Sequence, residues 1–167
     1  FLSHPFGDVL LAVPPPLFSP VGSPVLTARV SLAADPTLHL LGALFAELAA
    51  VWAGLAVFSQ VAGDRIGGGH LRDAIDRRAG VGVAYASAAT TLPRPTITDA
   101  HILGATIVPL AALVGVWAGY ASFRRGRASD RTGAETRMYE HIFVGVVTGV
   151  AALALAAIAY TVVYTPV

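Results

Sequence analysis

An almost uninterrupted apolar stretch decides the fold: residues 37–61 read TLHLLGALFAELAAVWAGLAVFSQV. A helix needs about 20 mainly apolar residues to cross the hydrocarbon core of a bilayer, and this stretch is long enough. Its one acidic residue is Glu47. A charged side chain in the middle of a spanning helix costs roughly 2.5 to 3.5 kcal/mol. We therefore predict a membrane-spanning helix in which Glu47 is protonated, paired or bound to a cation.

The composition extends this prediction to the whole chain. Of the 167 residues, 55% are hydrophobic and 13% are charged, whereas soluble domains carry about a quarter charged residues. Two further apolar stretches, 100–123 and 141–165, are long enough to span a bilayer. Another, 79–92, is too short to cross and is expected to form an interfacial or re-entrant helix. The predicted fold is an all-α integral membrane protein with three transmembrane helices.

The residues before the first span are predicted to form an extended arm. Prolines are concentrated there, and each removes a backbone donor and restricts the residue before it to extended conformations. The chain is thus divided into a proline-rich arm, 1–36, and a transmembrane domain, 37–167, in which a long loop follows the first span. Because the chain begins at Phe1 without an initiator methionine, it is expected to be a processed form.

The residue types exclude several kinds of chemistry. The chain has no cysteine, which removes disulfides, thiolate metal sites and cysteine nucleophiles. The sequence contains no activated nucleophile, acid-base pair or phosphate-binding loop, so an enzyme is not expected. The expected partners are lipids and the other subunits of a membrane complex, and no nucleic acid.

Small residues recur at four-residue spacing on each predicted span. They are Ala46, Ala50 and Gly54 on the first, Ala111, Gly115 and Gly119 on the second, and Gly145 and Gly149 on the third. Such ridges allow helix backbones to approach closely in a membrane. They also leave room for a flat ligand, so the sequence leaves open whether they serve helix packing or ligand binding.

Histidines occupy the first turns of the three spans, at His39, His101 and His141. A neutral imidazole can ligate haem iron or the magnesium of a chlorophyll. If successive spans alternate in direction, His39 and His141 lie on one side of the membrane and a haem could join them. The alternative is that each histidine is an interfacial hydrogen-bonding residue.

Glu47 shares one helix face with Ala43, Ala50, Val51 and Gly54, and the small residues among them make a shallow slot beside the carboxylate. The slot suits the metal of a flat macrocycle or a partner helix that carries arginine. Two other interpretations remain open: that Glu47 is a protonated or hydrogen-bonded structural acid, and that it takes part in proton or ion transfer.

Short motifs, in the same order along the chain, resemble those of the photosystem I reaction-centre subunit XI family, the L subunit. Residues 19–26, SPVGSPVL, are similar to the family's Thr-Pro and Ser-Pro-Leu stretch, and residues 69–73, GHLRD, resemble its Gly-Pro-Leu-Arg-Asp. Residues 119–123, GYASF, resemble its Gly-x-x-Ser-Phe. The glycines and aromatic residues of the third span, Phe143, Gly145, Gly149 and Tyr160, are similar to the family's pattern.

This resemblance implies a non-catalytic subunit of photosystem I in the plastid thylakoid membrane. Such a subunit binds chlorophyll a and carotenoid and contacts the reaction-centre core and antenna proteins. Glu47 falls where the family has a glutamate that ligates chlorophyll magnesium. The chain departs from the family at Val51, where the family's second ligand is a histidine, at 44–45, where Leu-Phe replaces Arg-Gly, and over 74–100, which is longer.

Two other function classes compete with this interpretation. In one, the chain is a small respiratory membrane anchor that holds haem b between His39 and His141. In the other, it is a pigment-free accessory subunit in which Glu47 is protonated. An absorption spectrum separates the three, because chlorophyll, haem and a colourless protein have different bands.

Overall fold

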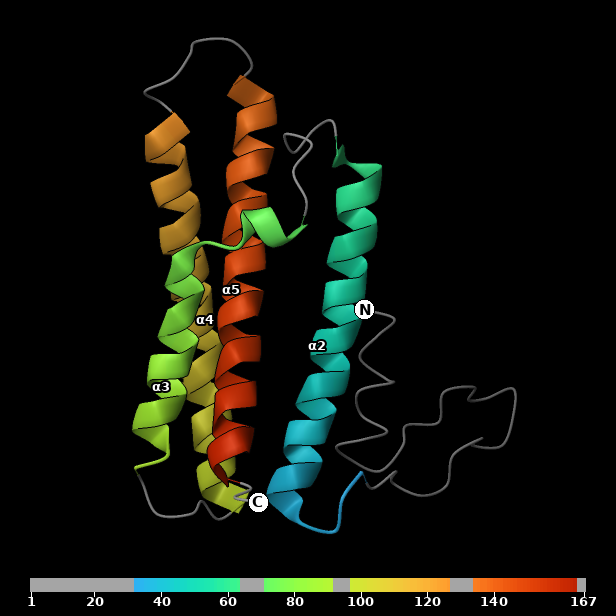
Figure 1. Ribbon diagram of the computed structural model, residues 1–167, viewed down its shortest axis with the longest axis vertical. Helices are drawn as coiled ribbons and strands as arrows, with labels where there is room; N and C mark the ends of the chain where they lie inside the picture. Colours follow the sequence, from blue (N-terminus) through green and yellow to red (C-terminus); the bar gives the residue numbers. More distant parts are fainter. Residues whose placement is uncertain (1–31, 64–70, 92–96, 127–133, 165–167) are drawn as a thin grey trace, which may run out of the picture. The chain divides into compact units, whose positions relative to one another are not determined.

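The computed structural model describes residues 32–63, 71–91, 97–126 and 134–164 (Figure 1). Three helices in these ranges are long and apolar enough to span a membrane: α2 (Pro36–Val61), α4 (Ile97–Gly126) and α5 (Ala134–Tyr164). The three predicted spans are therefore confirmed as helices of spanning length and composition, although α4 and α5 begin earlier than expected. The arm predicted over 1–36 lies almost wholly outside the described residues.

The chain forms two compact units, 1–47 and 48–167. In the first unit, α2 begins with a capped turn, because Asp35 Oδ1 accepts a hydrogen bond of 2.9 Å from the backbone N–H of Leu38. This bond satisfies one of the N–H groups that have no partner inside the helix. The rest of α2 and all later elements belong to the second unit.

The helices α4 and α5 form an antiparallel pair (Figure 1), and their backbones approach each other at glycine residues. A Cβ atom at Gly115 would lie 2.6 Å from the carbonyl oxygen of Gly145, and one at Gly149 would lie 2.9 Å from the carbonyl oxygen of Ala111. Only glycine allows this approach. The ridges of these two helices therefore serve packing within the chain. By contrast, a Cβ atom at Gly54 of α2 would meet nothing within 4 Å.

Three short elements follow α2 and precede α4 in the sequence, and together they form a packed segment. They are the 3-10 turns η2 (Leu71–Ala74) and η3 (Arg77–Gly80) and the helix α3 (Val81–Ala89). Residues of η2 pack against Phe143 of α5, whereas Ala86 of α3 packs against Ala156. At 1.5 Å per residue these two positions on α5 are about 20 Å apart. The region predicted to be a long loop with a short interfacial or re-entrant helix thus accompanies α5 through much of its spanning length.

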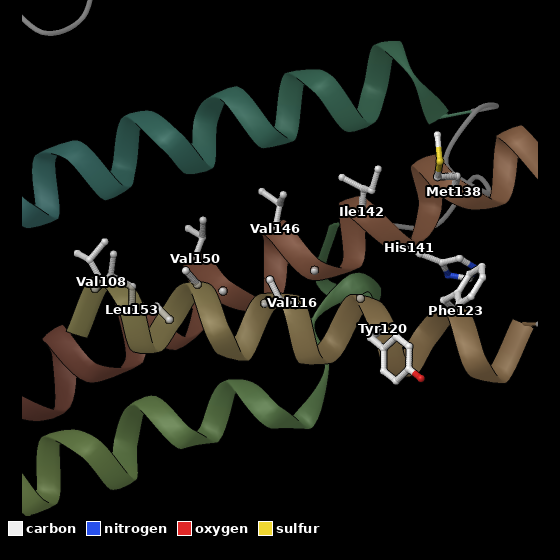
Figure 2. Close-up of a pocket in the computed structure, with 16 residues that line it drawn as sticks. Val108, Val116, Tyr120, Phe123, Met138, His141, Ile142, Val146, Val150 and Leu153 are labelled. Atoms are coloured by element: carbon white, nitrogen blue, oxygen red, sulfur yellow. The ribbon is translucent and has the colours of Figure 1, made fainter. Parts of the chain in front are cut away.

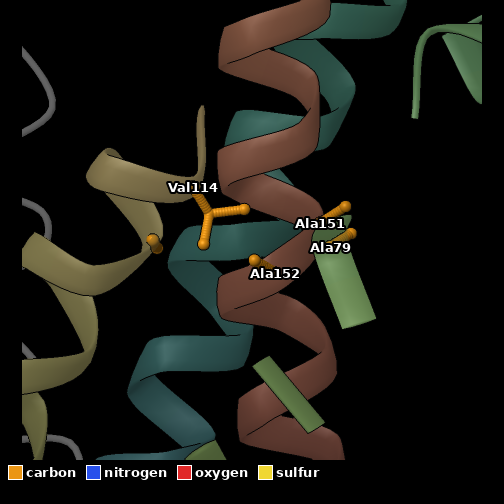
Figure 3. Close-up of a cluster of buried hydrophobic side chains, with 5 residues drawn as sticks. Ala79, Val114, Ala151 and Ala152 are labelled. Carbon is orange, nitrogen blue, oxygen red and sulfur yellow. The ribbon is translucent and has the colours of Figure 1, made fainter. Parts of the chain in front are cut away.

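Alanine and glycine bring this segment close to the helix pair. Ala79 of η3 is buried in one cluster with Val114 of α4 and with Ala151 and Ala152 of α5 (Figure 3). A Cβ atom at Gly82 would overlap the carbonyl oxygen of Ala152. The contact therefore depends on small residues on both sides, as in helix packing inside membranes.

The part of α2 in the second unit runs antiparallel to α5. Trp52 reaches the buried cluster that contains Ala151, whereas the ring centroid of Phe58 lies 5.8 Å from that of Phe143. Later residues of this part of α2 therefore contact earlier residues of α5, so the two run in opposite directions. Because α4 is also antiparallel to α5, this part of α2 and α4 run in the same direction. The expected alternation of direction holds for α4 and α5 but not for α2 and α4, because the segment η2 to α3 leads the chain back between α2 and α4.

Candidate functional site

His39 lies in the first unit and is buried, with 2% of its surface exposed. Its Nδ1 accepts a hydrogen bond of 3.1 Å from the backbone N–H of Leu32. In a neutral ring whose Nδ1 accepts a bond, the proton is on Nε2, so neither nitrogen offers a lone pair to a metal. This geometry favours the hydrogen-bonding role for His39 and disfavours a haem shared with His141.

The other two predicted ligands, Glu47 and His101, lie on α2 and α4. Glu47 is exposed on α2 and makes no ion pair with any residue that the structure describes. His101 lies in the second turn of α4, and its side chain is outside the described part of the chain. The roles predicted for both residues stay predictions.

His141, near the start of α5, is buried with 8% of its surface exposed and is held by α4. Its Nδ1 lies 2.9 Å from Ser122 Oγ, and the ring of Phe123 meets it edge-on at a centroid distance of 5.6 Å. In the tautomer in which Nδ1–H donates to Oγ, Nε2 carries the lone pair that binds metals. A Cβ atom at Gly126 would lie 3.2 Å from Nε2, so glycine keeps this nitrogen uncrowded.

A groove of about 600 Å³ runs along α4 and α5 and includes His141 (Figure 2). Small-molecule sites in proteins typically measure 300 to 1,000 Å³. The groove extends along α4 from Val108 to Phe123, which is about 22 Å at the rise of an α-helix. Figure 2 shows Val146 and Val150 of α5 projecting along one side of it. An apolar groove of this shape suits a long, flat or linear hydrophobic molecule.

A polar cluster that the sequence did not single out is centred on Asp76, whose side chain is 7% exposed. Arg78 Nη1 donates to both carboxylate oxygens at 2.9 Å, and Arg125 Nη2 donates to Oδ2 at 2.9 Å. Oδ1 also accepts from the backbone N–H of Arg78 at 3.0 Å. One carboxylate thus joins η3 to the last turn of α4.

Thr148 of α5 fixes the same cluster from the other side. Its hydroxyl accepts from the backbone N–H of Asp76 at 3.0 Å and donates to the carbonyl oxygen of Ala74 at 3.3 Å. The Arg78 guanidinium carbon lies 4.7 Å from the centroid of the Trp117 ring. Thr148 and Trp117 both belong to spanning stretches. Ionisable groups at that depth cost free energy unless they are paired, and they commonly mark functional sites. The cluster is therefore a second candidate site.

No protein-family model, curated protein or solved structure matches the chain. Within the described ranges, no three His, Asp or Glu side chains come together as a metal site would require. A metal-centred pigment on this part of the chain would therefore be bound by single side chains. Of the two histidines whose side chains the structure describes, His141 has the surroundings that fit this role.

Proposed function

We propose that the chain is a non-catalytic pigment-binding subunit of a photosynthetic reaction centre of the photosystem I type. The observation that carries this proposal is the apolar groove with the His141 imidazole at its edge. A chlorophyll presents a broad apolar surface and a central magnesium that accepts an axial ligand. The groove lining suits the apolar surface and Nε2 suits the magnesium. The motifs at 19–26, 69–73 and 119–123 support the same family.

Glu47 supports the proposal as a second ligand. Its carboxylate is exposed on an apolar spanning helix, where an uncompensated charge is expensive. A magnesium ion from a chlorophyll would compensate it, and the small residues Ala46 and Ala50 leave space beside it. In both sites the chain positions the pigment and excludes water, while the pigment supplies the photochemistry.

The groove also suits a carotenoid. Its length of about 22 Å along α4 and its almost wholly apolar lining match a linear polyene better than a compact ligand. Outside the groove, α4 exposes large apolar side chains such as Leu113 and Trp117, which would face lipid or neighbouring subunits. The resemblance of the motifs at 19–26, 69–73 and 119–123 to the photosystem I subunit is the reason to propose a location in the plastid thylakoid membrane.

Replacing His141 by leucine is expected to remove one chlorophyll per copy of the chain, because leucine fills the space but offers no lone pair. Pigment extraction from the purified complex, with protein quantified in parallel, measures the ratio. Ser122→Ala is the matched control, since it keeps the imidazole and removes only its hydrogen-bond partner. It should retain the pigment with a shifted absorption band. An unchanged ratio in His141→Leu would rule out His141 as a ligand.

The same purified complex separates the competing functions. Chlorophyll gives a red band, whereas a b-type haem gives Soret and α bands that change on addition of dithionite. Haem bands without chlorophyll would replace the photosynthetic proposal with a respiratory anchor. A complex with neither set of bands would favour the interpretation that the chain is a pigment-free accessory subunit.

Replacing Glu47 by leucine is also expected to lower the chlorophyll count by one per copy. Glu47→Gln should retain part of it, because an amide oxygen still binds magnesium, though more weakly than a carboxylate. Val51→Leu, at an exposed position one turn further along α2, serves as the control for a change on the same helix. If Glu47→Leu and Val51→Leu have the same pigment content, Glu47 is not a ligand.

A further inference from the structure

The polar cluster carries more positive than negative charge. Two guanidinium groups, those of Arg78 and Arg125, share the single carboxylate of Asp76. The carboxylate accepts four hydrogen bonds, three from Arg78 and one from Arg125, which is about its full capacity. Each guanidinium has five N–H groups, so most donors of the pair have no acceptor on Asp76. A net charge of one remains between η3 and α4.

The two arginines differ in exposure, and this difference determines which of them a ligand could reach. The side chain of Arg78 is 18% exposed, and its Nε is buried without an acceptor among the described residues. The Trp117 ring stabilises the cation by a cation–π contact but leaves Nε without a hydrogen bond. The side chain of Arg125 is 66% exposed. A ligand therefore reaches the cluster through Arg125, with Arg78 behind it.

The surrounding sequence is also basic. Arg124 precedes Arg125 in the last turn of α4, and the connection that follows contains Arg127 and Arg131. Basic pockets at the ends of membrane helices attract anionic headgroups, and juxtamembrane arginines contribute roughly 1 kcal/mol each to that attraction. The end of α4 thus favours anions over cations or neutral groups.

We propose that Arg125 and Arg78 bind one oxyanion of the phosphate class, and that Asp76 holds the two guanidinium groups side by side to receive it. A phosphodiester carries one negative charge, which equals the excess of the cluster. Planar guanidinium groups bind such oxygens through paired hydrogen bonds. The oxyanion is the phosphodiester of a lipid headgroup or a free phosphate. This site is separate from the pigment groove and does not depend on it.

The test uses the full chain purified from membranes and reconstituted into nanodiscs. Native mass spectrometry counts retained phosphatidylglycerol against phosphatidylcholine, and thermal unfolding at increasing inorganic phosphate, with chloride at equal ionic strength, detects a free anion. Arg125→Gln should reduce phosphatidylglycerol retention by about tenfold or more, since a tenfold change corresponds to the loss of one moderate interaction. Arg125→Lys should restore part of it.

Arg124→Gln is the matched control, because Arg124 is exposed in the same helical turn but is not paired with Asp76. Because Arg124 contributes only the general attraction of one juxtamembrane charge, this variant should lose clearly less phosphatidylglycerol than Arg125→Gln does. Equal retention in Arg125→Gln and Arg124→Gln would overturn the proposal, as would the absence of any effect of lipid charge and of phosphate. A response to phosphate without phosphatidylglycerol retention would identify the free anion. Pigment content, read from the same samples, should not change in either variant.

Discussion

Replacing Asp76 by alanine is expected to lower the free energy of unfolding by about 3 to 5 kcal/mol, which is the usual effect of removing one partner of a buried ion pair. The loss arises mainly at Arg78, whose side chain is 18% exposed and would keep its charge without a carboxylate beside it. Asp76→Ala also removes the acceptor that joins η3 to α4. Unfolding in mixed micelles, followed by circular dichroism, measures the change.

The matched control is Asp73→Ala, three residues earlier. Asp73 also pairs with an arginine, Arg72, but at 3.8 Å and with both side chains exposed. Exposed pairs contribute from zero to about 1 kcal/mol, so this variant should unfold almost like the original chain. If both variants lost the same small amount, the Asp76 cluster would be an ordinary surface interaction. Replacing Asp76, Arg78 and Arg125 together by leucine should recover much of the stability, because no buried charge would remain unpaired.

Replacing Gly115 by valine is expected to cost about 3 kcal/mol or more, at the upper end of the range for overpacked cores. The new Cβ would lie 2.6 Å from the carbonyl oxygen of Gly145, and a backbone atom cannot move aside as a side chain does. The two helices must separate, and the contacts along the whole ridge weaken. The change also alters the floor of the groove, so pigment retention should fall with stability.

Gly54→Val provides the comparison on α2. Its new Cβ would meet nothing within 4 Å, so we expect little change in the same unfolding assay. Similar losses in Gly115→Val and Gly54→Val would mean that the effect comes from the removal of glycine and not from helix contact. Gly82→Val should behave like Gly115→Val, because its Cβ would also overlap a backbone carbonyl.

The sequence predicted the parts of the fold that depend on local patterns. Apolar length alone identified α2, α4 and α5, because the hydrocarbon thickness sets the length of a spanning helix. The direction of α4 relative to α2 was predicted wrongly. It depends on residues 71–89, which contain Asp76, Arg77 and Arg78 and therefore read as a loop by hydropathy. The carboxylate of Asp76 is paired in part with Arg125, 49 residues away, and a local pattern does not contain that contact.

The candidate site also combines features that local sequence patterns predict with features that depend on tertiary contacts. His39 and His141 both occupy early turns of spanning helices, and nothing in the sequence distinguishes them. The structure does so, because His39 accepts a bond from Leu32 whereas His141 is oriented by Ser122 across a helix pair. The triplet Asp76-Arg77-Arg78 directly before an apolar stretch was the signal for the polar cluster. Its meaning depended on Thr148, which only tertiary packing brings to it.

The packing of η2, η3 and α3 also determines when this segment can enter the bilayer during biosynthesis. The segment is too short and too charged to leave the translocon as an independent span. Its polar partners, Arg125 and Thr148, lie later in the chain, so the ribosome completes them after Asp76. We therefore expect the segment to complete its packing only after α4 and α5 have been made.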